Sequence, residues 1–179
     1  MSIKALIELA PPPASPTGTV GEHWPWLERR LSLRLPTDYK NLIDLYGVGD
    51  FAGFITIFSP LCKIPHLNLI NHSRNTTRYE REFTENEDEY PFVFYPDAGG
   101  LLPFGATELW DTLFWRTSGA PEGWPIVVQE NKSTNYEEIE ASTTDFIAGV
   151  ISGVRVPKMF GSDGIEIDKG FRAFQEKLD

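Results

Sequence analysis

A chain of 179 residues fits a single domain, and its 41% hydrophobic content, including 13% aromatic residues, is typical of a globular protein with a sizeable core. The formal net charge of −10 argues against DNA or RNA as a ligand, because nucleic acids are bound by basic surfaces, and it suits a basic partner. No stretch approaches the roughly 18 apolar residues that a membrane span needs. The N-terminal residues lack the apolar core and cleavage site of a secretory signal, so we expect no membrane association and a cytoplasmic location.

Metal, cofactor and catalytic sites are not predicted. Cys62 is the only cysteine, which excludes an internal disulfide and a cysteine-rich metal site. His66 and His72 are six residues apart, a spacing that a helix brings onto one face less well than three or four. The glycine-rich residues 47–53 have the wrong spacing for a dinucleotide fingerprint and precede a predicted strand instead of following one.

Residues 1–22 are predicted to form a short helix and a proline-rich linker. Apolar residues recur there at helical spacing: Ile3, Leu6, Ile7 and Ala10. The prolines from Pro11 to Pro16 end this helix and favour extended backbone. This segment is interpreted as a spacer, and the less favoured alternative is that it docks into an aromatic groove of a partner. A second helical stripe then follows: Trp24, Leu27, Leu31 and Leu35.

Residues 35–60 carry a helix signal that passes into a strand signal through two glycines. Pro36 suits the first turn of a helix. Four later residues then form its apolar face: Tyr39, Leu42, Ile43 and Tyr46. Gly47 is expected to end the helix, and Gly47 and Gly49 are expected to hold backbone conformations that are closed to other residues. Residues 51–58 predict one strand.

From Phe92 onward, aromatic and β-branched residues come in short runs that turn residues separate. Five runs are predicted to be strands: residues 92–95, 100–104, 111–115, 124–129 and 136–140. Connections this short imply antiparallel pairing. Leu113 and Trp115 should face one side of the sheet and Phe114 the other, and we expect Trp115 and Trp124 in the core.

A last core helix is predicted after the strands, with Ser142 or Thr143 as its N-cap. Helix signals at both ends and strand signals between them predict a single α+β domain, in which N-terminal and C-terminal helices flank an antiparallel central sheet. We place this domain at residues 23–154. Residues 155–179 are assigned to a C-terminal extension with a further helix from Lys169.

Several stretches carry a family resemblance. LPTDYK, an apolar helix that ends in YGVGDF, and GFITIFSP resemble the SUKH superfamily, the group of Smi/Knr-type cell-wall regulators and bacterial immunity proteins. LLPFGATELWDTLFW and EGWPIVVQE look like the later core strands of that family, and STTDFIAGVISG looks like its closing helix. The chain departs from the family pattern at Trp110, where the family commonly has a glycine before the residue equivalent to Asp111.

The resemblance implies a non-enzymatic immunity protein that binds and neutralises a cognate bacterial toxin, for which a nuclease is one candidate. The charge agrees with this, because the phosphate-binding clefts of nucleases are basic and an acidic surface can compete for them. Two alternatives remain: an intracellular protein-binding scaffold or regulator of the Smi/Knr type, and, less favoured, an enzyme that uses carboxylates among Asp97, Glu108 and Asp111.

Acidic and aromatic residues are predicted to bind the partner: Glu85, Glu87, Asp88, Glu89, Asp97 and Trp110. Four of them lie in the segment TENEDEY, whose dense like charges favour an exposed loop. This loop is either solvated and without a role, or part of a negative field that speeds association by roughly tenfold to a thousandfold. Trp110 is included because the fold does not require it at a glycine position, and tryptophan is common in binding hot spots.

Overall fold

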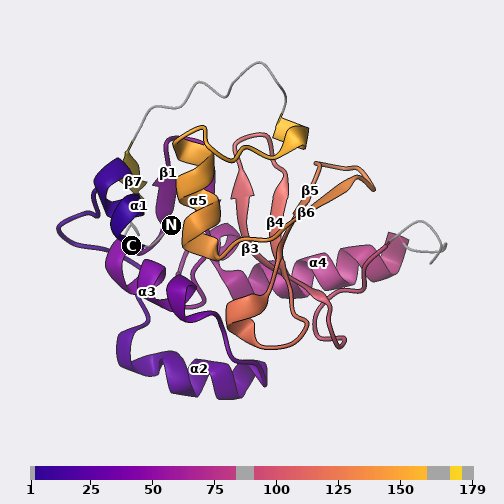
Figure 1. Ribbon diagram of the computed structural model, residues 1–179. Coiled ribbons are helices and arrows are strands. Elements are labelled where there is room, and N and C mark those ends of the chain that lie inside the picture. Colours follow the sequence, from indigo (N-terminus) through magenta and orange to yellow (C-terminus); the bar gives the residue numbers. More distant parts are fainter. Residues whose placement is uncertain (1–2, 84–90, 161–169, 175–179) are drawn as a thin grey trace.

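The computed structural model describes residues 3–83, 91–160 and 170–174, and it describes the backbone alone for residues 79–83 (Figure 1). In these residues seven strands form one antiparallel sheet in the order β6-β5-β4-β3-β2-β1-β7. The strands are β1 (Gly49–Phe51), β2 (Ile55–Ile57), β3 (Leu101–Thr107), β4 (Thr112–Arg116), β5 (Ile126–Gln129), β6 (Tyr136–Ile139) and β7 (Phe171–Ala173). The predicted α+β domain with an antiparallel central sheet is confirmed.

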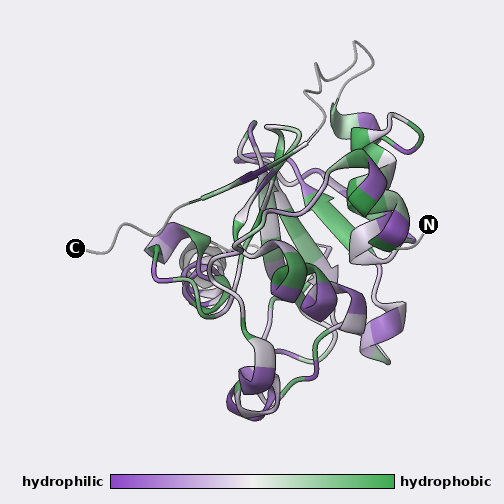
Figure 2. Cartoon of the chain, turned by 90° about the vertical axis from the view of Figure 1, so that its left-hand side faces the viewer, coloured by the Kyte–Doolittle hydropathy of each residue, from purple (hydrophilic) through white to green (hydrophobic). Residues whose placement is uncertain are grey.

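The α-helices of the described residues are α1 (Ile3–Leu9), α2 (Trp24–Leu31), α3 (Thr37–Tyr46), α4 (Leu69–Phe83) and α5 (Thr143–Ile151). Short 3-10 helices lie at Gly21–His23, Pro65–Leu67, Pro121–Gly123 and Lys158–Phe160. α1 and α3 both pack against α5, while α4 packs against β3 (Figure 1). Figure 2 shows hydrophobic residues gathered on the strands and on the helices that pack against them.

The main core lies between the sheet and helices α3 and α5. The predicted apolar face of α3 is confirmed, because Tyr39, Leu42, Ile43 and Tyr46 are all buried. Both tyrosine hydroxyls donate hydrogen bonds to carbonyl oxygens, Tyr39 to Phe58 at 2.6 Å and Tyr46 to Ala10 at 2.7 Å. These partners let the phenols be buried without an unsatisfied polar group, and burial raises the pKa of Tyr46 to about 12.

The strand β4 carries apolar residues on both faces, as predicted. Leu113 and Trp115 belong to the main core, whereas Phe114 packs on the other face with Phe94, Leu101 and Val127. Trp115 and Trp124 are buried, so their assignment to the core is confirmed. The N-cap of α5 is also confirmed, because the Ser142 hydroxyl accepts a hydrogen bond from the backbone N–H of Asp145.

Residues 51–58 do not form one strand, as predicted, but a tight hairpin of β1 and β2. Ala52 and Gly53 both have positive φ, at 60° and 68°, as in a type I′ turn. The backbone N–H of Phe54 donates to the carbonyl of Phe51 at 3.0 Å and closes the turn. The aromatic residues on either side of Gly53 concealed this turn in the sequence.

Gly47 and Gly49 are needed for different reasons. Gly47 has φ of +70°, and a Cβ there would also overlap the backbone of Thr17, so its predicted special conformation is confirmed. Gly49 instead lies in β1 without a positive φ, so the prediction was wrong about its backbone. It is needed for space, because a Cβ would collide with the carbonyl of Arg172 and the ring of Phe171.

Two further predictions of secondary structure were wrong. Residues 92–95 form no strand but a single parallel bridge from Phe94 to Leu101, because the chain turns at once through a hydrogen bond from Asp97 N to Phe94 O. The helix expected from Lys169 is replaced at Phe171–Ala173 by β7, since the open edge of β1 offers backbone partners there.

Candidate partner-binding site

The structure separates the predicted partner-binding residues. Trp110 follows the end of β3, whereas Asp97 precedes its start and accepts a hydrogen bond from Gly100 N through its carbonyl. At about 3.4 Å per residue, the length of β3 puts roughly 20 Å between these two ends. Asp97 and Trp110 therefore do not form one compact site. The other four candidates lie outside the described residues: Glu85, Glu87, Asp88 and Glu89.

Residues 107–111, which we name the Trp110 turn, connect β3 to β4. Two backbone hydrogen bonds close the turn, from Trp110 N to Thr107 O at 3.0 Å and from Thr107 N to Asp111 O at 2.9 Å. Trp110 has φ of +69°, a conformation that is an outlier for a bulky residue and easy for glycine. The turn thus keeps the backbone form that suits glycine, although the residue is tryptophan.

The carboxylate of Asp111 holds this turn from inside. Asp111 is only 5% exposed. Its Oδ2 accepts from the Thr107 hydroxyl at 2.9 Å, and its Oδ1 accepts from the backbone N–H of Asn131 at 3.1 Å. The Thr107 hydroxyl in turn accepts from Asp111 N. Both oxygens of this carboxylate have structural partners, which gives Asp111 a role in holding the turn.

Neighbouring turns further restrain the Trp110 turn. Glu108 N donates to Phe54 O at 2.9 Å, which joins the turn to the hairpin of β1 and β2. The bond from Asn131 joins it to the hairpin of β5 and β6. The three connections lie at the same end of the sheet, because Ile55 pairs with Thr107 and Thr112 pairs with Gln129.

Two side chains of the Trp110 turn are both apolar and exposed. Trp110 is 77% exposed and Leu109 is 55% exposed. Sequence reasoning selected Trp110 as a candidate from its place at a family glycine and did not consider Leu109. The sequence did contain a signal for the exposure of Leu109. An apolar residue in a turn of two or three residues is too far from the core to be buried there.

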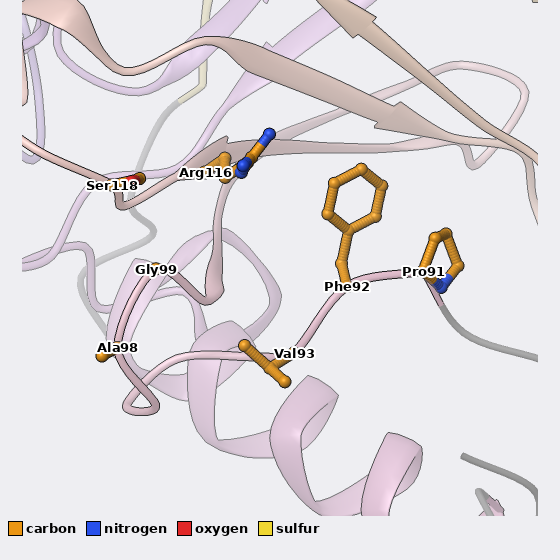
Figure 3. A pocket seen from close by; sticks show the side chains of 7 residues that line it. All are labelled: Pro91, Phe92, Val93, Ala98, Gly99, Arg116 and Ser118. Atoms are coloured by element: carbon orange, nitrogen blue, oxygen red, sulfur yellow. The ribbon is translucent and has the colours of Figure 1, made fainter. Parts of the chain in front are cut away.

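The surroundings of Asp97 are different. Next to it, a shallow depression of about 370 Å³ is lined by Pro91, Phe92, Val93, Ala98, Gly99, Arg116 and Ser118 (Figure 3). The Arg116 guanidinium is already engaged, because it pairs with Glu138 at 2.8 Å and lies 5.9 Å from the centre of the Phe92 ring. The depression therefore has an aromatic wall and a neutralised cation, and we assign no chemistry to it.

Two further findings concern the described residues alone. Among them, no group of three or more His, Cys, Asp or Glu side chains is placed to hold a metal ion. In the same part of the chain, no helix combines the length and the apolar character that crossing a membrane requires.

Comparison with known proteins identifies the family. No curated protein and no solved structure matches the chain. The family model SUKH_6, described as SMI1-KNR4 cell-wall, matches residues 22–147. The match covers well over half of the chain and contains α2, α3, the strands β1 to β6 and the Trp110 turn. The chain therefore belongs to the SMI1-KNR4 family of the SUKH superfamily.

Proposed function

We propose that this protein is a non-enzymatic immunity protein that binds and neutralises a cognate toxin, and that the Trp110 turn is an anchor of its binding surface. Its family fits, at a coarse level, either an immunity protein or a regulator of the Smi/Knr type. The observation that carries the proposal is Trp110 itself, an exposed aromatic residue with a positive φ, which is unfavourable for a bulky side chain.

The energetics of Trp110 support a role outside folding. A left-handed backbone conformation costs a residue other than glycine about 1 to 2 kcal/mol. At 77% exposure, the indole recovers little of that cost by burial within its own chain. Strained residues that the surrounding structure holds in place cluster at functional sites. We therefore interpret Trp110 as a residue kept for contact with another molecule.

The rigidity of the Trp110 turn supports an anchor in particular. The hydrogen bonds of Asp111 to Thr107 and Asn131 fix the backbone before any partner arrives. A preorganised side chain loses less entropy on binding, so more of its contact energy appears as affinity. Truncation of such an aromatic anchor typically costs about 2 kcal/mol or more of binding free energy.

The charge of the chain supports a basic partner. The formal net charge is −10, and Glu108 lies exposed beside Leu109 and Trp110. A basic nuclease toxin is the candidate class that this charge fits, since a negative surface attracts the cleft that would otherwise hold phosphates. The candidates for this attraction remain the predicted acidic residues Glu85, Glu87, Asp88, Glu89 and Asp97. Of these, Asp97 lies at the opposite end of β3 from Trp110.

The test begins with isolation of the partner. The wild-type chain and its Trp110→Ala variant are immobilised and exposed to extract of the source cells, and Trp26→Ala serves as the matched control. Trp26 is also an exposed tryptophan, at 48%, but it lies in helix α2. We expect a protein that the wild type and Trp26→Ala retain and Trp110→Ala loses.

The retained protein is then produced alone in a host cell and together with the chain. If it is an immunity target, it stops growth alone, the wild-type chain restores growth, and Trp110→Ala does not. A partner that is harmless alone would overturn the immunity proposal in favour of the regulator. A partner that Trp110→Ala retains as well as the wild type would remove the Trp110 turn from the interface.

A further inference from the structure

The outer side of helix α2 carries one tryptophan and two arginines, which we name the α2 face. Helical spacing puts Trp26 on the same side as Arg29 and Arg30, which follow it by three and four residues. All three side chains are exposed. The opposite side of the helix is buried in the core: Trp24, Leu27 and Leu31. Figure 1 shows α2 at the lower margin of the molecule.

The polar groups of the α2 face have no acceptor among the described residues. There, the side chains of Arg29 and Arg30 form neither an ion pair nor a hydrogen bond. The indole N–H of Trp26 has no acceptor in the same part of the chain, whereas Trp24 donates its own to Asp44 at 2.7 Å. The α2 face therefore presents a set of hydrogen-bond donors that the fold leaves unused.

The α2 face is basic, although the chain is acidic. Residues 29–34 contain three arginines and no acidic residue, while the whole chain has 26 acidic and 16 basic residues. The preceding carboxylate, Glu28, is engaged elsewhere, because it accepts from Lys40 Nζ at 2.8 Å and from Leu35 N at 3.0 Å. Arg34 is exposed and also forms no ion pair within the described residues. This local positive charge attracts anionic groups.

The α2 face is ordered before any partner binds. The Arg30 guanidinium lies 5.8 Å from the centre of the Trp26 ring, which is a cation–π contact. This contact uses the face of the ring and leaves the N–H donors of the guanidinium available for a carboxylate. The end of the helix is fixed as well, since the Tyr95 hydroxyl donates to Leu31 O. A preorganised surface loses less entropy on binding.

The α2 face and the Trp110 turn lie towards opposite ends of β3. Tyr95, which holds the end of α2, also donates its backbone N–H to Leu101 O at 3.1 Å, where β3 begins. Trp110 follows the residue at which β3 ends. The two surfaces are therefore separate, and Trp26→Ala remains a suitable control for Trp110→Ala.

We infer that the α2 face is a binding site for an acidic segment of a second protein. Arg29 and Arg30 pair with carboxylates of that segment, for which the guanidinium fork has the matching geometry. Trp26 takes an apolar or aromatic side chain that lies beside these carboxylates. The inference goes beyond the proposed function and does not rest on it, because the Trp110 turn is proposed to meet a basic partner.

The charge balance favours an acidic protein segment over two other occupants. A nucleic acid carries a long anionic backbone, which the net charge of −10 repels and which three arginines neutralise only in small part. A second copy of the chain brings the same net charge of −10 and is repelled as a whole. A short segment brings only a few carboxylates to α2, and these can be paired one by one.

The test measures the binding of fluorescent peptides to the full-length chain by anisotropy at low salt. The probe is a peptide Asp-Glu-Phe-Glu-Asp with blocked ends. One control peptide replaces its phenylalanine with serine, and another replaces its four acids with the matching amides. The protein variants are Trp26→Ala and the double variant of α2, Arg29→Gln with Arg30→Gln.

Helix α4 offers a matched control for the double variant of α2. Arg74 and Arg78 are also exposed, lie four residues apart and form no ion pair within the described residues. Arg74→Gln with Arg78→Gln therefore changes the net charge by the same amount at another place. It separates a site at α2 from a general effect of charge.

We expect the double variant of α2 to bind the acidic peptide at least about tenfold more weakly than the wild type, and Trp26→Ala about threefold more weakly. The double variant of α4 should bind within about twofold of the wild type. The serine peptide should bind the wild type about threefold more weakly than the probe, and the amide peptide should not bind. In the 15N-labelled chain, the probe should shift the indole N–H signal of Trp26, which Trp26→Ala identifies.

Four outcomes would overturn the inference. The first is that the probe does not bind the wild type at low salt. The second is that the double variants of α2 and α4 weaken binding equally while both keep the melting temperature of the wild type, which would leave only a general effect of charge. The third is that the probe leaves the Trp26 signal unchanged. The fourth is a dimer of the wild type in light scattering that the double variant of α2 abolishes, which would assign the α2 face to a second copy.

Discussion

The junction between α3 and β1 and the Trp110 turn use the same kind of backbone in opposite ways. Gly47 and Trp110 have nearly the same φ, +70° and +69°. Gly47 is buried against the chain's own Thr17, whereas Trp110 extends into solvent. At the junction the sequence removes the strain with glycine, and at the turn it retains the strain with a large aromatic side chain.

This difference separates a folding role from a binding role. A residue that serves only the fold is expected to relieve strain, because strain lowers the free energy of unfolding. Trp110 is the bulkiest of the described residues other than glycine that have positive φ, the others being Ser32, Ala52 and Lys132. The comparison therefore predicts that changes at the junction harm stability, and that changes at Trp110 harm binding.

The largest expected effect is at the junction. Gly47→Ala should lower the free energy of unfolding by about 3 kcal/mol, because the methyl group adds a collision with Thr17 to the cost of a positive φ. Gly53→Ala is the matched control, with φ of +68° and open space around the position. It should cost only about 1 to 2 kcal/mol in urea denaturation. Equal losses for both variants would show that the contact with Thr17 does not restrict Gly47.

A smaller loss is expected from the support of the Trp110 turn. Asp111→Ala should lower the free energy of unfolding by about 2 kcal/mol, because Thr107 and Asn131 each lose a buried acceptor. It should also weaken partner binding, since Trp110 would no longer be held in place. Asp111→Asn, which keeps one acceptor oxygen, should show about half of each effect. Weakened stability with unchanged affinity would argue that the turn need not be rigid to bind.

The acidic segment should affect the rate of association more than the bound state. Neutralising Glu85, Glu87, Asp88 and Glu89 together should slow association at low salt by roughly tenfold and leave dissociation unchanged. Trp110→Ala should show the reverse pattern, because a desolvated anchor acts mainly on dissociation. Stopped-flow measurements at low and high salt separate the two. If association is independent of salt in the wild type, these acids do not steer the partner.

The smallest expected effect is a dependence of stability on pH at His72. Its ring stacks on Phe58 at 3.9 Å, and burial lowers its pKa below the usual 6.5, although a hydrogen bond to His66 O opposes this. The unfolded chain then binds more protons as the pH falls through about 6.5, so stability should decline there on acidification. His72→Gln should flatten this part of the curve. An unchanged slope between about pH 7.5 and 5.5 would contradict the shift.

Features with local causes could be predicted from the sequence. The periodicity of Tyr39, Leu42, Ile43 and Tyr46 predicted α3 because a helix is defined by neighbours three and four residues apart. The alternation of Leu113, Phe114 and Trp115 likewise predicted which side chain faces which side of the sheet.

Features with distant causes could not be predicted. β7 depends on the fit of Phe171 over Gly49, and the sequence does not reveal a pairing across most of the chain. The separation of Asp97 from Trp110 depends on the length and direction of β3. Trp110 could be selected as a candidate from a family position. The hydrogen bond from Asn131 to Asp111 that supports its turn could not be predicted, because it joins two hairpins that only the folded sheet brings together.

The central claim is tested most directly by one variant, Trp110→Gly, measured both for its free energy of unfolding and for its affinity for the isolated partner. Glycine relieves the positive φ but is more flexible when unfolded, so the free energy of unfolding should stay the same or rise by up to about 1 kcal/mol. Affinity should fall by at least about tenfold, because the anchor is gone. A variant that is clearly less stable and binds as tightly as the wild type would show that Trp110 serves the fold and not the partner.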